Sequence, residues 1–304
     1  MSTRITSDMV TSSTLANINA AQAALDRTQE ELSSGKSILE PSSNPYGASQ
    51  IIDLQSALDG LTSYEQSAQD GLSRTNAASG ALTSMDSQVQ RVRELVLQAA
   101  NGTNSPSDLE AIAGEVSQLT EGVKQDALTQ YDGQYVFSGT LTTTAPYTQG
   151  AGDEYHGNAA PLARAIGPGS TVNVAVNLSS VLGSGAGAAD GKLLDTLRTI
   201  ASHLREGTPA AVEALRTTDL SNLDANITSL TGLQAEAGAT TDQLNLALSR
   251  ISSLSTTDTE QLANVQDANI AKVSMEYSNE HAAFEAALKA GASIVQESLL
   301  EFLH

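Results

Sequence analysis

The side chains best able to do chemistry are four histidines, at His156, His203, His281 and His304. Asp153 and Glu154 precede the first of them, and carboxylates beside an imidazole could ligate a metal ion. These residues lie in a Gly-rich segment with turn character, which favours a solvated loop instead. No two histidines are close in sequence, and the H-E-x-x-H spacing is absent. We therefore expect no metal site.

Other routes to catalysis are also missing from the sequence. The chain has no cysteine, which excludes disulfides, zinc–thiolate sites, thiol nucleophiles and iron–sulfur clusters. The phosphate-loop, nucleophile-elbow and dinucleotide-binding glycine patterns are absent. The Gly-rich run at 183–190 follows no dinucleotide-fold strand and has no lysine for a phosphate, so it is typical of a flexible linker. We expect no catalytic residue, no cofactor and no enzyme.

The composition points to an elongated helical protein. The 304 residues carry a formal net charge of -20, which argues against nucleic acid and anionic membranes as partners. Only 3% of residues are aromatic, and the apolar content comes from Leu, Ala, Val and Ile, which suits thin helical rods. No segment is long and apolar enough for membrane insertion, and the polar start lacks a secretory apolar region. We expect either a cytoplasmic protein or one exported with an uncleaved N-terminus.

Helix start and stop signals divide the first half of the chain. A helix is predicted over 14–34, ending at Gly35, which suits the position after a helix. Asn44 then Pro45 predicts a cap and first turn for a long helix that runs to about residue 100. Ser105 followed by proline restarts a helix that ends near residue 131 and returns antiparallel.

The middle of the chain changes character. Glycines and prolines concentrate there, and residues 135–137 and 171–176 have strand character. Helical periodicity returns near residue 192, and Thr208 before a proline predicts a further long helix. The Ser/Thr/Asp cluster at 252–258 predicts a break, with the last helix over 259–303.

These elements predict a mainly α fold, a long antiparallel helical rod or coiled-coil bundle built from both chain ends, with a small β-rich insert. The predicted domains are an N-terminal helix (1–40), the first half of the rod (41–140), the insert (141–189), the second half of the rod (190–257) and a C-terminal helix (258–304).

Both terminal helices carry an apolar stripe at spacings of three, four or seven. An isolated helix is marginal in water, so we expect these helices to pair with each other or with neighbouring copies, and to stay disordered until they do. The predicted subunit-interface residues are Leu15, Ile18, Leu25, Leu32, Val273, Tyr277, Phe284, Leu288, Val295, Leu299 and Phe302.

Five stretches follow one another in an order and spacing found in a known family. They read LSSGK…PSSNP at 32–45, VQRVREL…ANGTN at 89–104, GQYVFSGT at 133–140, VQDANI at 265–270 and EAAL…SLLEFL at 285–303. Together they resemble the flagellin family, in its hook-associated protein 3 branch. The third and fifth stretches separate this branch from filament flagellins. Two acids of the family's P-S-D-D-P turn are replaced by Ser43 and Asn44, which keeps the helix cap but not the charges. The motif residues are Ser34, Gly35, Asn44, Pro45, Arg91, Arg93, Glu94, Leu95, Tyr135, Phe137, Gly139, Asp267, Ser298, Leu299 and Leu300.

The resemblance implies a structural adaptor of the bacterial flagellum that joins hook to filament and assembles as a ring through its terminal helices. The implied partners are other copies of the chain, a hook-side hook-associated protein and the flagellin filament. It also implies type III export to the cell exterior without a cleaved signal peptide, and a chaperone that covers the C-terminal helix before export. A chain without cysteine suits export in an unfolded state.

Two alternatives stay open from the sequence. The first is flagellin itself, the filament subunit. The second, from another class, is a surface-displayed adhesin or immune-recognised module, presented by the insert or by the helix around residues 91–95.

Overall fold

The computed structural model describes residues 7–101, 104–150, 152–183 and 189–302, with the backbone alone at 7–8 and 294–302. The chain forms two compact units. The first unit contains residues up to Gly60 and from Leu254 onward, and the second contains Leu61–Ser253. The predicted domain boundaries stay predictions.

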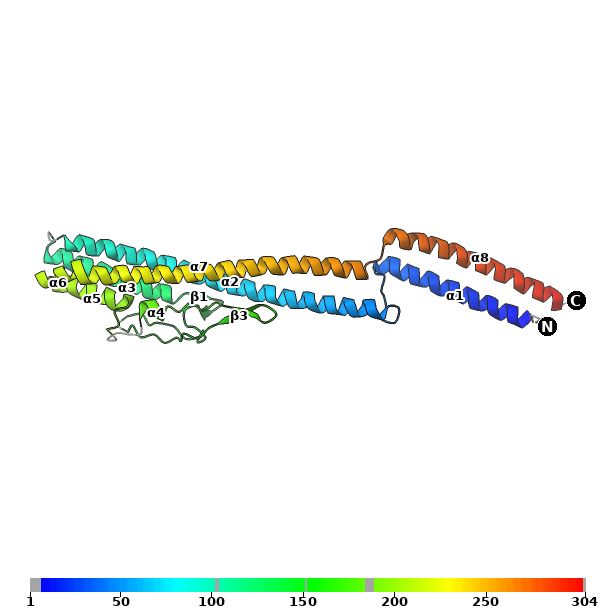
Figure 1. The fold of residues 1–304 in the computed structure, drawn as a ribbon, viewed down its shortest axis with the longest axis horizontal. Coiled ribbons are helices and arrows are strands. Elements are labelled where there is room, and N and C mark those ends of the chain that lie inside the picture. Colours follow the sequence, from blue (N-terminus) through cyan, green and yellow to red (C-terminus); the bar gives the residue numbers. More distant parts are fainter. Residues whose placement is uncertain (1–6, 102–103, 151, 184–188, 303–304) are drawn as a thin grey trace. The chain divides into compact units, whose positions relative to one another are not determined.

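The first unit is built around the two terminal helices. Helix α1 (Ser7–Ser34) and helix α8 (Ile270–Phe302) lie side by side and antiparallel (Figure 1). The unit also holds the start of α2 (Pro45–Ala100) and the end of α7 (Leu220–Gln266). Of the two arrangements expected for the terminal helices, pairing with each other or with neighbouring copies, the structure shows the first within one chain.

Short-range signals fix the ends of these helices as predicted. Gly35 has a φ of 69°, and its N–H donates to the Glu31 carbonyl at 2.9 Å, which closes α1. Asn44 Oδ1 accepts from the Gly47 N–H at 3.0 Å and caps α2, whose first residue is Pro45.

The predicted break at 252–258 is wrong, because α7 continues through it to Gln266. The hydroxyls of Ser253 and Thr259 donate to carbonyls four residues earlier, so these polar side chains bond to the helix instead of ending it. The break falls at 267–269. There Asn269 Oδ1 accepts from the Lys272 N–H at 3.1 Å and caps α8.

The second unit is an antiparallel helical bundle. It holds the rest of α2 and α7 together with α3 (Pro106–Ala127), α5 (Leu193–Glu206) and α6 (Pro209–Ala214). Ser105 forms a reciprocal capping box with Asp108, and the Thr208 hydroxyl accepts from the Ala211 N–H at 3.2 Å, as their sequence signals predict. A π-helical turn (Leu215–Asp219), not anticipated from the sequence, joins α6 to α7.

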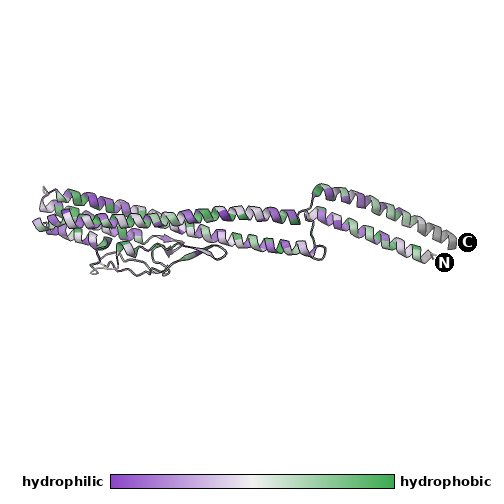
Figure 2. Cartoon of the chain, in the orientation of Figure 1, coloured by the Kyte–Doolittle hydropathy of each residue, from purple (hydrophilic) through white to green (hydrophobic). Residues whose placement is uncertain are grey.

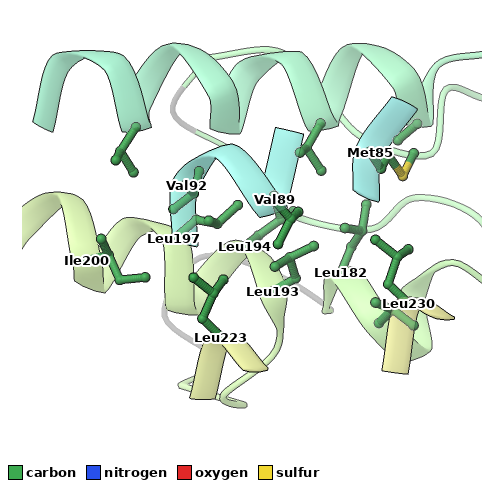
Figure 3. Close-up of a cluster of buried hydrophobic side chains, with 14 of the residues drawn as sticks. Met85, Val89, Val92, Leu182, Leu193, Leu194, Leu197, Ile200, Leu223 and Leu230 are labelled. Atoms are coloured by element: carbon green, nitrogen blue, oxygen red, sulfur yellow. The ribbon is translucent and has the colours of Figure 1, made fainter. Parts of the chain in front are cut away.

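The bundle encloses a core made of aliphatic side chains. Figure 3 shows Val89 and Val92 of α2 facing Leu193 and Leu197 of α5, with Leu223 and Leu230 of α7 beside them. Each of these six side chains is fully buried. Aliphatic residues at helical spacing therefore suffice to close the bundle with few aromatic rings.

The middle of the chain carries two short antiparallel hairpins and irregular loops, which confirms a small β-containing insert. Strand β1 (Gln130–Tyr131) pairs with β2 (Gln134–Tyr135), and β3 (Ala163–Gly167) pairs with β4 (Ser170–Asn173). The strand predicted to reach residue 176 ends at Asn173. The side-chain oxygen of Asn173 accepts hydrogen bonds from the N–H groups of Leu162 and Ala175. A short helix, α4 (Ser179–Leu182), follows.

Candidate assembly surface

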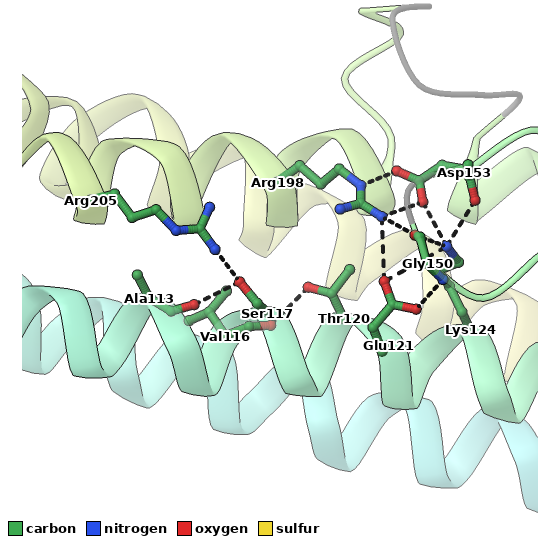
Figure 4. Close-up of polar contacts among 11 residues, drawn as sticks. Ala113, Val116, Ser117, Thr120, Glu121, Lys124, Gly150, Asp153, Arg198 and Arg205 are labelled. Carbon is green, nitrogen blue, oxygen red and sulfur yellow. Dashed lines mark hydrogen bonds and ion pairs between the residues drawn. The ribbon is translucent and has the colours of Figure 1, made fainter.

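The acidic group next to His156 is engaged by cations of the protein. Asp153 is 3% exposed, and its carboxylate accepts from Lys124 Nζ at 3.0 Å and from Arg198 (Figure 4). Burial raises the pKa of Asp153, but the hydrogen bonds from Arg198 and Lys124 outweigh it and hold that pKa below its usual value. Glu154 and His156 are exposed. Among the described residues no cluster of three or more potential metal ligands occurs.

The other histidines are scattered. His203 Nδ1 lies 2.6 Å from the buried carboxylate of Asp219 in the π-helical turn, an arrangement that ties α5 to the turn. His281 is exposed beside Glu285 and its ring lies 6.2 Å from that of Tyr277. His304 lies outside the described residues.

Two of the family-like stretches meet at one joint in the first unit. The Ser37 N–H donates to the Gln266 carbonyl at 2.7 Å, and the Ala268 N–H donates to the Gly35 carbonyl at 2.8 Å. Lys36 and Asp267 form an isolated antiparallel bridge between these bonds, and Ser34 Oγ accepts from the Lys36 N–H. Backbone hydrogen bonds therefore join the turn after α1 to the break before α8.

The stretch around residue 91 lies on α2 in the second unit. Leu95 is buried in the bundle core. Arg91 pairs with Glu94 and, across to α3, with Glu115, and these contacts raise its pKa. Arg93 pairs at 2.7 Å with Asp224 of α7. The charged residues of this stretch therefore connect neighbouring helices of the bundle.

The GQYVFSGT stretch anchors the start of the insert. Phe137 is fully buried in the core, and the Tyr135 carbonyl accepts from buried Arg74 at 2.7 Å. Gly139 is buried with a φ of 64°, and a side chain there would collide with the Asn158 carbonyl. Its glycine is therefore required by backbone conformation and by close approach.

The predicted interface residues divide into two sets in the α1–α8 pair. Ile18, Leu25 and Leu32 of α1, and Val273, Tyr277 and Phe284 of α8, are buried or half-buried. Since α1 and α8 pack against each other, these residues supply the seam between them. Figure 2 shows apolar residues alternating with polar ones along both helices, as a seam of this kind requires.

Leu15 and Leu288 lie beside the seam, and their side chains stay exposed. Leu15 is 57% exposed and Leu288 is 45% exposed. Both line an open groove of about 470 Å³ on the α1–α8 pair. Its lining residues are Thr11, Thr14, Leu15, Ile18, Leu288, Gly291 and Ala292. An apolar groove with two exposed leucines is a surface that a further helix can cover.

The remaining predicted residues are on the last turns of α8. Val295, Ser298, Leu299, Leu300 and Phe302 lie within the helix, but their side chains are outside the described part of the structure.

The sequence analysis missed two groups of residues. Lys124 is completely buried yet holds the insert, and no short motif marks it. Thr28 and Glu280 meet between the terminal helices at 2.6 Å. The spacing of Thr28 from Leu25 and Leu32 gave a usable signal, because it continues the same helical face.

Comparison with known proteins relates the N-terminal part of the chain to flagellins. Residues 5–142 match the bacterial flagellin N-terminal helical region. Flagellin from Salmonella muenchen is 38% identical and flagellin from Salmonella typhimurium 37% identical, each over 129 residues, or 42% of this chain. The aligned part spans about a quarter (26%) of the length of these flagellins.

Several solved structures share the fold over most of their length. A proposed flagellar hook-associated protein from Vibrio parahaemolyticus superimposes with a TM-score of 0.65 at 18% identity, over 74% of this chain and 100% of that one. FlgL from Xanthomonas campestris gives 0.60 at 16% identity, over 69% and 99%. The flagellar junction protein FlgL from Legionella pneumophila gives 0.57 at 15% identity, over 71% and 99%. These likenesses establish the fold, and the flagellin match confirms the predicted family resemblance. In the described residues, no helix is both long and apolar enough to cross a membrane.

Proposed function

We propose that this chain, whose residues 5–142 match the bacterial flagellin N-terminal helical region, is a structural adaptor that joins the flagellar hook to the filament. The observation that supports it most is the extent of the two likenesses. The fold matches FlgL chains over nearly their whole length, whereas the flagellin match covers about a quarter of the curated flagellins. The role is structural rather than enzymatic.

In this proposal the subunits form a ring through their terminal helices. The groove beside Leu15 and Leu288 supports it, because covering exposed leucines is favourable by about 25 cal/mol per Å² of apolar surface. The net charge of -20 opposes association of identical copies, so this burial must outweigh repulsion, and salt should favour assembly. The ring would contact a hook-side hook-associated protein on one side and the flagellin filament on the other.

The proposal includes the route by which the protein reaches the flagellum. The chain is exported without a cleaved signal peptide and acts outside the cell. Before export, a chaperone covers the C-terminal helix, whose apolar residues Tyr277, Phe284 and Leu288 would otherwise be accessible whenever α1 is not in place.

Deleting the gene in the source bacterium separates adaptor from filament subunit. Loss of an adaptor should leave hooks without filaments and release intact flagellin into the medium. Loss of a filament subunit should remove that flagellin from the medium, and this result would refute the adaptor role. Electron microscopy of the cells and gel analysis of the medium give both readouts.

Complementation tests the groove. A Leu288→Asp variant should fail to restore filaments, because a carboxylate cannot enter an apolar interface without a partner. Leu246→Asp is the matched control, since Leu246 is an exposed leucine of the second unit and the charge change is the same. Restoration of filaments by Leu288→Asp would contradict the proposed interface.

A further inference from the structure

The seam between the terminal helices follows a heptad-like spacing. Buried or half-buried seam positions alternate by three and four residues along each helix. On α1 they are Thr11, Thr14, Ile18, Ala21, Leu25, Thr28 and Leu32; on α8 they are Val273, Tyr277, Glu280, Phe284, Ala287 and Gly291. Small or apolar residues fill most of these positions. Thr28, Glu280 and Gly291 stand out because one is a buried hydroxyl, one is a carboxylate and one has no side chain.

Thr28 and Glu280 bond to each other across the seam. The Thr28 hydroxyl is buried and donates to Glu280 Oε2 at 2.6 Å. The carbonyls of Ala24 and Leu25 lie farther from the hydroxyl, at 3.2 and 3.0 Å. A hydroxyl has one hydrogen, and the nearer, charged acceptor makes the stronger bond. In any other register the hydroxyl can return to its own helix, but the half-buried carboxylate loses its partner.

Gly291 supports the same register by close approach. A Cβ at residue 291 would lie 2.9 Å from Ile18 Cδ1 and 3.3 Å from Thr14 Cγ2. Sliding α8 by one turn would bring Ala287 or Val295 to this place, and each carries a Cβ. The ends of the Ile18 and Thr14 side chains would then have to shift, which loosens the packing at this level of the seam.

We propose that Thr28 and Glu280 are positioning residues that set the axial register of the α1–α8 pair. A single polar contact in an apolar seam can select register in this way, because only one alignment satisfies it. The register decides which side chains flank the seam at the same level. In the observed register Leu15 and Leu288 line one groove, so the Thr28–Glu280 contact also shapes the surface proposed to meet a neighbouring copy. This last step rests on the proposed function.

The test reads the register by disulfide cross-linking in the full-length chain. Since the chain has no native cysteine, an introduced pair reports alone. Thr14→Cys with Gly291→Cys is the in-register pair: Thr14 Cγ2 lies 3.3 Å from the Cβ position at 291, and a disulfide holds each sulfur roughly 3 Å from the opposite Cβ. Thr14→Cys with Ala287→Cys reports a slide of one turn, about 6 Å along the helix.

In a glutathione redox buffer the in-register pair should cross-link at least about tenfold more than the shifted pair, the ratio expected when one hydrogen bond to a charged group separates the two alignments. Thr28→Val should lower this ratio by roughly the same tenfold factor, while Thr28→Ser, which keeps the hydroxyl, should retain it. Equal cross-linking of both pairs in the parent protein would overturn the proposal. So would an unchanged ratio in Thr28→Val.

A second variant keeps the test decisive if Thr28→Val fails to fold. Glu280→Leu removes the acceptor and makes the seam apolar, so it should preserve helix content by circular dichroism and still lower the ratio. Glu285→Leu is the matched control, because Glu285 lies on the same helix with its side chain 56% exposed and off the seam. A loss of register in Glu285→Leu as large as that in Glu280→Leu would refute the assignment.

The two proposals fail in distinguishable ways. The cross-linking ratio is read on the isolated protein and does not depend on any partner. Glu280→Leu should in addition restore fewer filaments than Glu285→Leu in the deletion strain. If the cross-linking ratio changes as expected but the deletion strain shows no adaptor phenotype, the register role of Thr28 and Glu280 is supported and the adaptor function is refuted.

Discussion

Replacing Asp153 with asparagine tests how the insert is held on the bundle. Lys124 Nζ is fully buried and has three acceptors, the carbonyls of Gly150 and Gly152, both at 2.8 Å, and Asp153 Oδ1 at 3.0 Å. Arg198 binds the same carboxylate (Figure 4). Asparagine keeps the shape but removes the charge, so two cations are left around one neutral amide.

The burial of this ion pair sets the expected loss of unfolding free energy. Removing one member of a buried ion pair costs about 3–5 kcal/mol, because the other charge is left uncompensated. Glu121 stays as a more distant anion, 3.7 Å from Lys124 and 3.5 Å from Arg198, and it places the expected loss at the lower end, about 3 kcal/mol. Lys124→Met should cost less, about 1–3 kcal/mol, because Asp153 then keeps Arg198. The double variant should cost clearly less than the sum of the single variants, since it leaves no unpaired charge between Lys124 and Asp153.

The assay is urea unfolding followed by near-ultraviolet circular dichroism. Tyr147 and Tyr155 lie in the insert with ring centroids 5.4 Å apart, and they supply a signal from that region, while far-ultraviolet dichroism follows the helices. Single variants that each lower the unfolding free energy by under about 0.5 kcal/mol, the range of ordinary surface substitutions, would show that these ion pairs do not hold the insert. Additive costs in the double variant would refute the pairing.

The pH dependence gives an independent check with a defined sign. The pKa of Asp153 is lower in the folded protein than its ordinary value of about 3.9. The contribution to stability is therefore fully present above about pH 4 and is lost as pH falls through the lower, folded-state pKa. The stability gap between the parent protein and Asp153→Asn should start to narrow near pH 4 and close as pH falls through the folded-state pKa, and a gap that does not narrow on acidification would contradict this cause.

Two further predictions concern other parts of the chain. Limited proteolysis of the free protein should cut within residues 1–35 and 265–304 before it cuts the second unit, because one helix pair buries less surface than the bundle; intact ends after the bundle is digested would contradict this. Gly139→Ala should lower the unfolding free energy by more than the roughly 1–2 kcal/mol that a left-handed backbone costs alanine, because its methyl would also meet the Asn158 carbonyl. Urea unfolding measures this loss, and an unchanged midpoint would show that the turn can rearrange.

Sequence reasoning located several helix ends whose signal was contained in a few neighbouring residues. The cap at Asn44, the capping box at Ser105 and the left-handed Gly35 all involve bonds within one turn, so neighbouring residue types encode them. The same reasoning failed at 252–258. Serine and threonine can either leave a helix or bond back to it, and the sequence does not say which.

The identity of the seam was decided by packing. Leu15 and Ile18 are three residues apart and belong to overlapping apolar faces, so periodicity alone assigned both to one interface. In the structure both side chains line the groove, but Ile18 is half-buried in the seam next to Gly291, whereas Leu15 is 57% exposed.

Composition, caps and helical periodicity are local properties, and they sufficed to predict an acidic, cysteine-free, mainly helical chain with an apolar stripe on each terminal helix. Only the tertiary structure placed Lys124 against Asp153, 29 residues away, and Thr28 against Glu280, 252 residues away. Such contacts depend on how helices align and loops close, and those choices follow from the summed packing of the whole unit rather than from any single stretch of residues.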